Sequence, residues 1–234
     1  MIKKNIQKIG SSENKVLKVI ATLLRLPIKT AQLQLLNIQK DRNIINLIEK
    51  VQRGKNFTMW PAEMMQLYIC AYSTKKLPGD FAEVGVYQGT SAKLICEAKD
   101  DKPLHLFDTF EGLPAPEETD GNILHQKQYA AKLDLVKNYL GNYKNLTFNQ
   151  GIFPKTAEPV KNKSFAFVHL DVDLYNSTLE CLKFFYPRMV RGGVILSHDY
   201  STLPGVKKAF DEFFVGKMEL VLELSTSQCL IVKL

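Results

Sequence analysis

Cysteine is scarce in this sequence, and long apolar runs are absent. The 234 residues include four cysteines and no CxxC pair, which excludes the usual spacing of a structural zinc site or a dithiol redox site. Three of the four lie in apolar runs, so we expect reduced, structural thiols. No apolar stretch approaches the roughly 20 residues that span a bilayer, and the N-terminus lacks the apolar core and cleavage site of a secretory signal. We therefore expect a cytoplasmic protein without a transmembrane segment.

Low-complexity tracts and internal repeats are also missing. Hydrophobic residues make up 45% of the chain and charged residues 24%, the balance of a folded globular protein. The length allows one large domain with an added segment, but leaves little room for two full domains. We expect a helical segment over residues 1–57 and one larger domain over residues 58–234.

The formal net charge of the chain is +7, and the positive charge is concentrated near the start, where acidic residues are rare. Glu13 alone opposes a run of cations there: Lys3, Lys4, Lys8, Lys15, Lys18, Arg25 and Lys29. Such a segment can bind nucleic acid, an anionic membrane surface or an acidic partner. Because no aromatic residues alternate with the cations, we expect no nucleic-acid partner. Peripheral membrane contact and a solvated helix face both stay open.

Apolar residues recur at helical spacing from Val16 to Val51. Pro27 predicts a break between two helices. A third helix is expected near Trp60, with Thr58 as its N-cap. The apolar stripes of these helices favour packing on the main domain, and they make a homo-oligomer plausible.

Strands and helices alternate beyond Pro78. Alternation predicts a doubly wound α/β fold with a mostly parallel sheet, and two final strands predict an antiparallel edge. The expected strands are 80–86, 103–107, 146–149, 165–170, 194–197, 219–224 and 228–232. The expected helices are 90–99, 128–140, 177–186 and 206–214.

A glycine-spaced turn follows the first expected strand. Gly85 and Gly89 allow backbone to approach a ligand, and the following helix N-terminus offers amide donors to a carboxylate. The spacing is neither the dinucleotide GxGxxG nor a P-loop. Asp108 ends the second strand, 19 residues beyond Gly89, where an acid contacts ribose hydroxyls in nucleotide-binding sheets. These features together indicate a nucleotide-like cofactor.

Ionisable residues end two later strands. Alternation places His169, Asp171 and Asp173 on one side of the chain if the strand stays extended. His198 and Asp199 end the next strand, so Asp171 and Asp199 are expected to converge on one cleft. Carboxylates suit Mg²⁺, and the imidazole shifts the preference toward Mn²⁺, Fe²⁺ or Zn²⁺.

Together these stretches resemble the macrocin O-methyltransferase family, which methylates sugar hydroxyls in macrolide biosynthesis. The matching pieces are PGDFAEVGVYQGTSA, LFDTFEGLPAP, GIFPKT, LDVDLYNST, YPRMVRGG, HDY and AFDEF. The resemblance implies a class I methyltransferase fold with a seven-stranded, Rossmann-like sheet. It also implies S-adenosylmethionine as cofactor, a divalent metal (Mg or Mn) and a small-molecule or glycan acceptor.

The resemblance also assigns roles to residues. The metal would be held by Asp171, His198 and Asp199. Catalysis is expected from Asp171 and His198, with His125 as another candidate base. Cofactor binding would fall to Glu83, Gly85, Tyr87, Gly89, Thr90, Ser91, Asp108, Gly151, Ile152 and Asp171. The family usually has Asp-Asp-Tyr where this chain has His198-Asp199-Tyr200, a change that removes one negative charge from the expected metal site.

Two other interpretations fit the same fold. One is a nucleotide-dependent oxidoreductase, although the glycine spacing argues against it. The other is a non-catalytic protein that binds the cofactor and has lost turnover through the change at His198. The identity of the acceptor does not follow from the sequence.

Overall fold

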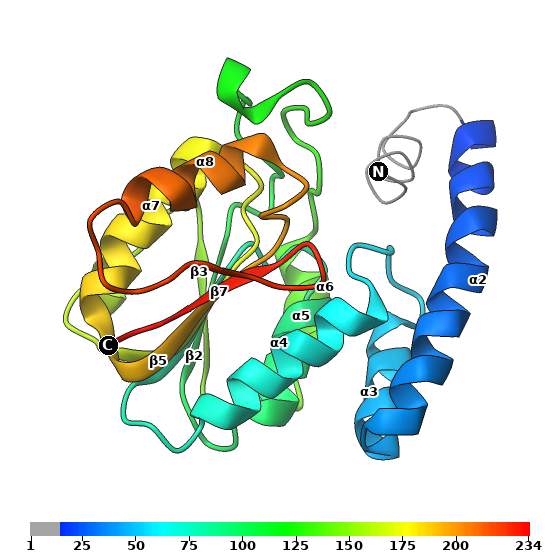
Figure 1. The fold of residues 1–234 in the computed structure, drawn as a ribbon, viewed down its shortest axis with the longest axis horizontal. Coiled ribbons are helices and arrows are strands. Elements are labelled where there is room, and N and C mark those ends of the chain that lie inside the picture. Colours follow the sequence, from blue (N-terminus) through cyan, green and yellow to red (C-terminus); the bar gives the residue numbers. More distant parts are fainter. Residues whose placement is uncertain (1–14) are drawn as a thin grey trace.

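The computed structural model describes residues 15–234 (Figure 1). Three N-terminal helices precede the sheet: α2 (Lys15–Gln39), α3 (Arg42–Gln52) and α4 (Pro61–Thr74). The strands are β1 (Asp80–Val84), β2 (Leu104–Asp108), β3 (Leu146–Gln150), β4 (Phe165–Leu170), β5 (Met189–Ser197), β6 (Leu222–Glu223) and β7 (Cys229–Val232). Between them lie α5 (Thr90–Ala98), α6 (Leu133–Leu140), α7 (Tyr175–Phe185) and α8 (Pro204–Phe213).

The seven strands form one sheet in the order β3-β2-β1-β4-β5-β7-β6. β1 to β5 run parallel, while β7 pairs antiparallel with β5 and with β6. The predicted α/β fold and its antiparallel edge are therefore confirmed. The strand order reverses between β1 and β4, which places a switch point where their carboxyl ends meet.

Successive side chains of the central strands fill two separate cores. Phe81 and Phe167 face the core under α4 and α5, whereas Ala82 and Val168 face the core under α7 and α8. Figure 1 shows these helix pairs on opposite sides of the sheet, with α2 and α3 outside α4. Because both faces of β4 are covered, every residue of that strand is buried.

Two predictions about the N-terminal helices are wrong. α2 continues through Pro27, which is exposed. The carbonyl that loses its amide donor at this turn can bond to water, so the proline costs a hydrogen bond without ending the helix. Thr58 is not the N-cap of α4: the helix begins at Pro61, and the amide of Trp60 donates to Glu63 Oε2 at 2.8 Å.

Other boundaries moved by a few residues. The helix predicted over 128–140 begins only at Leu133, and the last strand pair is shorter than predicted. All four cysteines are buried and free, as expected. Lys3, Lys4, Lys8 and Glu13 of the basic segment lie outside the described residues. In residues 15–234 no helix combines the length and apolarity needed to cross a membrane.

Candidate active site

One cavity opens at the carboxyl ends of β1, β2, β4 and β5. A parallel sheet with this switch point places its ligands there. Four non-glycine residues of the lining hold positive φ angles: Tyr87, Tyr129, Asp173 and Asp199. Such conformations cost about 1–3 kcal/mol each and persist where the surrounding structure requires them. Their concentration in one cavity marks it as the candidate functional site.

Gly85 brings the end of β1 against the chain that leaves β4. Its φ is +91°, and a Cβ atom there would lie 1.9 Å from the carbonyl oxygen of Asp171. No side chain can be accommodated at that distance, because the obstacle is backbone. The glycine therefore lets two strand ends meet directly beneath the cavity.

We expect Gly85→Ala to lower the free energy of unfolding by more than about 3 kcal/mol, since a backbone clash adds to the cost of a positive φ. Gly54→Ala is the matched control, because Gly54 also has a positive φ but a Cβ atom there would meet no atom within 4 Å. It should cost only about 1–2 kcal/mol. Urea unfolding of both variants measures the difference, and equal losses would contradict the backbone contact at Gly85.

Asp108 holds the turn after β1 in place. Its Oδ2 accepts the amides of Val86 at 2.7 Å and Tyr87 at 2.8 Å, and its Oδ1 accepts the amide of Phe110 at 2.6 Å. Burial raises the pKa of this carboxyl group, although the three amides partly oppose the shift. Asp108 lines the cavity, and through its hydrogen bonds to Val86 and Tyr87 it also shapes the glycine turn.

The two predicted aspartates converge beside His198. His198 Nδ1 lies 3.2 Å from Asp171 Oδ1 and 2.9 Å from Asp199 Oδ2. One ligand atom from each residue can be chosen so that all lie within 4.8 Å of one another. Asp199 is held further by Thr202, whose hydroxyl donates to Asp199 Oδ1 at 2.5 Å. The group therefore lies at the adjoining ends of β4 and β5.

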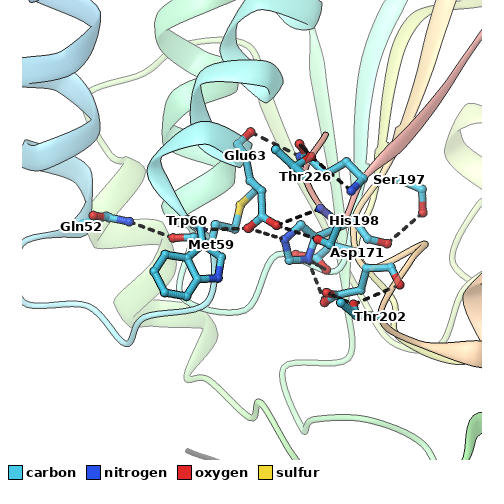
Figure 2. A network of polar contacts seen from close by, with 12 residues as sticks. Gln52, Met59, Trp60, Glu63, Asp171, Ser197, His198, Thr202 and Thr226 are labelled. Carbon is cyan, nitrogen blue, oxygen red and sulfur yellow. Dashed lines mark hydrogen bonds and ion pairs between the residues drawn. The ribbon is translucent and has the colours of Figure 1, made fainter. Parts of the chain in front are cut away.

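The other ring nitrogen of His198 faces a carboxylate from a different part of the chain. His198 Nε2 lies 3.2 Å from Glu63 Oε2 (Figure 2). Burial alone would lower the pKa of His198, but the charges of Asp199, Asp171 and Glu63 raise it well above its ordinary value. Without a metal ion, this imidazole is therefore the cation that balances the carboxylates.

The donor set also fits a divalent ion. Two carboxylate oxygens and one imidazole nitrogen lie within 4.8 Å of one another, and these are donor types that divalent cations bind. A ligating imidazole usually donates its second N–H to a carboxylate, and Glu63 supplies that acceptor. An all-oxygen site suits Mg²⁺. Replacing one carboxylate by an imidazole, a softer ligand, shifts the preference toward Mn²⁺ or Fe²⁺.

Asp173 adds a third carboxyl group to the cavity wall. It is buried, and burial together with the charges of Asp171 and Asp199 raises its pKa well above the ordinary value. A carboxylate of raised pKa is a stronger base than an exposed one. Because Asp173 has φ +61°, strand alternation does not continue to it.

The predicted cofactor residues divide into two groups. Eight line the cavity: Gly85, Tyr87, Thr90, Ser91, Asp108, Gly151, Ile152 and Asp171. Glu83 and Gly89 lie outside the lining. Glu83 is fully buried with its Oε1 2.9 Å from His169 Nδ1, because the two residues are register partners on β1 and β4. Gly89 is the N-cap of α5 and packs beside Val136.

His169 and His125 also lie away from the cavity lining. Strand alternation predicts His169 on the same side of the chain as Asp171 and Asp173. His169 does not join them at the cavity, because its side chain pairs inside the sheet with Glu83.

Sequence reasoning missed part of the cavity wall. Tyr129 lies in the loop before α6, and burial raises the pKa of its hydroxyl. Phe153, Ser177 and Cys181 also line the cavity. Phe153 and Ser177 stand within the GIFPKT and LDVDLYNST stretches, whereas Tyr129 and Cys181 lie outside every matching stretch. All four reach the cavity through the loop or helix that packs over the strand ends. Only the composition of the segment around Tyr129, which is polar and lacks helical spacing, could have indicated a loop.

Comparisons with known proteins agree on one family. The family described as macrocin-O-methyltransferase (TylF) matches residues 56–220. Demethyldecarbamoylnovobiocin O-methyltransferase of Streptomyces niveus is 31% identical over 167 residues, covering 64% of this chain and 63% of that protein. Mycinamicin III 3''-O-methyltransferase of Micromonospora griseorubida is 27% identical over 155 residues, covering 58% and 61%. The matched region thus spans less than two thirds of each of these relatives.

A solved structure supports the same relation. The O-methyltransferase NovP superimposes with a TM-score of 0.63 at 26% identity, covering 73% of this chain and 78% of NovP.

Proposed function

The chain belongs to the macrocin O-methyltransferase family and has the class I methyltransferase fold, and on that premise we propose that it is an S-adenosylmethionine-dependent O-methyltransferase acting on a sugar hydroxyl of a natural product. The observation that carries this proposal is the convergence of Asp171, His198 and Asp199 beside a cavity bounded by the glycine turn. The relatives named above are, by name, O-methyltransferases of demethyldecarbamoylnovobiocin and of mycinamicin III. Family membership favours this interpretation over a dinucleotide-dependent oxidoreductase.

The cofactor would lie along the turn from Gly85 to Ser91. S-adenosylmethionine supplies a methyl group on a positively charged sulfur. The first amides of α5, after Gly89, would bind its carboxylate, since a helix N-terminus favours an anion. Asp108 Oδ1 accepts one amide and keeps capacity for a ribose hydroxyl. Gly151 and Ile152 would border the adenine.

Asp171, His198 and Asp199 would hold a divalent ion, Mn²⁺ or Mg²⁺. When bound, the ion would lower the pKa of an acceptor hydroxyl and orient its oxygen. Asp171 is the most accessible of the three ligands, with a side chain 21% exposed, whereas the side chains of His198 and Asp199 are 2% and 7% exposed. The two buried residues would fix the ion, and Asp171 would lie closest to the acceptor.

Asp173 is the base that the geometry favours. His198 has both nitrogens directed at carboxylates, and Asp171 and Asp199 would be committed as ligands. Asp173 would take the proton of the acceptor hydroxyl as that oxygen forms a bond to the methyl carbon and the carbon–sulfur bond breaks. Most of the remaining acceleration would come from alignment of the two reactants in a cavity with little water.

Binding of the product cofactor tests the proposal most directly. We expect S-adenosylhomocysteine to bind with micromolar affinity in isothermal titration calorimetry, because the glycine turn and Asp108 are already formed. Titration with Mn²⁺ in a second experiment tests the ion. Absence of cofactor binding with and without Mn²⁺ would reject the enzyme. Cofactor binding without Mn²⁺ binding would instead favour an enzyme or binding protein in which the His198 cation replaces the ion.

The wider organisation of the chain belongs to the same proposal. We propose that residues 58–234 form the methyltransferase domain and residues 1–57 a helical segment, of which residues 1–14 lie outside the described part of the chain. Cytoplasmic location, contact of the basic N-terminus with a membrane surface and a homo-oligomeric state stay predictions from the sequence.

A further inference from the structure

Glu63 is an acidic residue that no strand end or motif explains. It lies in the first turn of α4, only 1% exposed, and reaches the end of β5 across 135 positions of sequence. Burying a carboxylate costs several kcal/mol unless partners compensate, so its position requires a reason.

The partners of Glu63 hold both carboxylate oxygens. Oε2 accepts the amide of Trp60 at 2.8 Å and lies 3.2 Å from His198 Nε2. Oε1 accepts the hydroxyl of Ser227 at 2.6 Å and its amide at 3.3 Å. Figure 2 shows Glu63 between Trp60 and His198, with Asp171 on the other side of the imidazole. The carboxylate thus has little freedom to move away from the ring.

Capping α4 does not account for this arrangement. An exposed acid in the first turn would accept the amide of Trp60 equally well and would avoid the cost of burial. The contacts to His198 and Ser227 are long-range and serve no helix end. They do fix the position of an acceptor beside His198 Nε2.

A carboxylate can only accept a hydrogen bond, so the nitrogen that faces Glu63 must carry the proton. Nδ1 faces two carboxylates as well, so without an ion both ring nitrogens carry a proton. A ligating imidazole keeps one N–H, and Glu63 fixes that N–H on Nε2, which leaves the lone pair of Nδ1 directed toward Asp171 and Asp199. That orientation is the one in which Nδ1 can bind an ion together with the two carboxylates.

We propose that Glu63 is a positioning residue for His198. Trp60 and Ser227 fix its carboxylate beside His198 Nε2. There it holds the imidazole in the orientation and tautomer that present Nδ1 to a divalent ion between Asp171 and Asp199. This inference rests on the proposed metal role. The arrangement also places the negative charge of Glu63 behind the ring, on the side away from Asp171 and Asp199.

The test is Mn²⁺ affinity of the purified protein, measured by electron paramagnetic resonance, for wild type, Glu63→Gln and Glu63→Ala. Glu63→Gln keeps an acceptor of similar size and loses the charge, whereas Glu63→Ala loses both. We expect Glu63→Ala to bind Mn²⁺ about 10–100-fold more weakly, the usual loss when the carboxylate behind a ligating histidine is removed. Glu63→Gln should fall between. Glu49→Gln is the control, because Glu49 is exposed on α3.

A nitrogen-15 spectrum of the imidazole separates positioning from a general loss of structure. In the Zn²⁺-loaded wild type, His198 should show a protonated Nε2 and a metal-bound Nδ1, and Glu63→Ala should show a mixture of ring states. S-adenosylhomocysteine affinity should stay unchanged in Glu63→Gln, which shows that the fold is intact. If wild type binds Mn²⁺ and both variants bind it equally tightly with the same ring state, the positioning role is overturned and the proposed function stands. If wild type binds no divalent ion, the metal role itself fails.

Discussion

Asp171→Asn is expected to lower kcat of methyl transfer by about 10³-fold. A divalent ion at a reacting oxygen lowers the activation free energy by several kcal/mol, and each 1.4 kcal/mol is about tenfold in rate. Asp171 is the ligand most open to the cavity, so its loss should separate the ion from the acceptor. Adding Mn²⁺ should no longer raise the rate. The assay is production of S-adenosylhomocysteine over a panel of glycosides and nucleotide sugars.

The control for this variant is Asp101→Asn, an exposed aspartate beyond the other end of the sheet. Binding of S-adenosylhomocysteine should change far less than kcat in Asp171→Asn, since eight predicted cofactor residues line the cavity and seven remain unaltered. Full activity with an unchanged response to Mn²⁺ would remove Asp171 from the metal site.

Asp173→Asn should lower kcat by about 10²–10⁴-fold, the usual contribution of a general base. The carboxyl group must be ionised to accept a proton, and burial, the largest cause of its raised pKa, persists when an ion offsets the charges of Asp171 and Asp199. Wild-type activity should therefore be lost as the pH falls through that raised pKa, at a higher pH than an ordinary aspartate would give. The residual activity of Asp173→Asn should lack this acid limb.

The pH profile distinguishes the base from a residue that only shapes the cavity. A structural role would lower the rate at every pH and leave the acid limb in place. If Asp173→Asn keeps both the acid limb and most of the rate, the base is one of the other candidates. The pH profile of Asp101→Asn is the control: a profile like that of wild type excludes a general effect of lost charge.

Local pattern was sufficient for the order of elements. The alternation of apolar runs between Asp80 and Val232 predicted seven strands close to their observed positions, since a strand buried on both faces is recognisable from its own residues. The placement of Asp171 and Asp199 followed from the same reasoning, because the carboxyl ends of neighbouring parallel strands meet at one edge.

Register and long-range packing decided the rest. His169 pairs with Glu83 because β1 and β4 align those two residues, and no periodicity within β4 contains that information. Glu63 reaches His198 only because α4 packs across the end of β5. The sequence by itself determined the fold class and which strand ends carry acids, because residues near in sequence set these features. Tertiary structure alone decided the histidine partners of Glu83 and Glu63, since the free energy of a buried charge depends on partners that here lie more than 80 positions away.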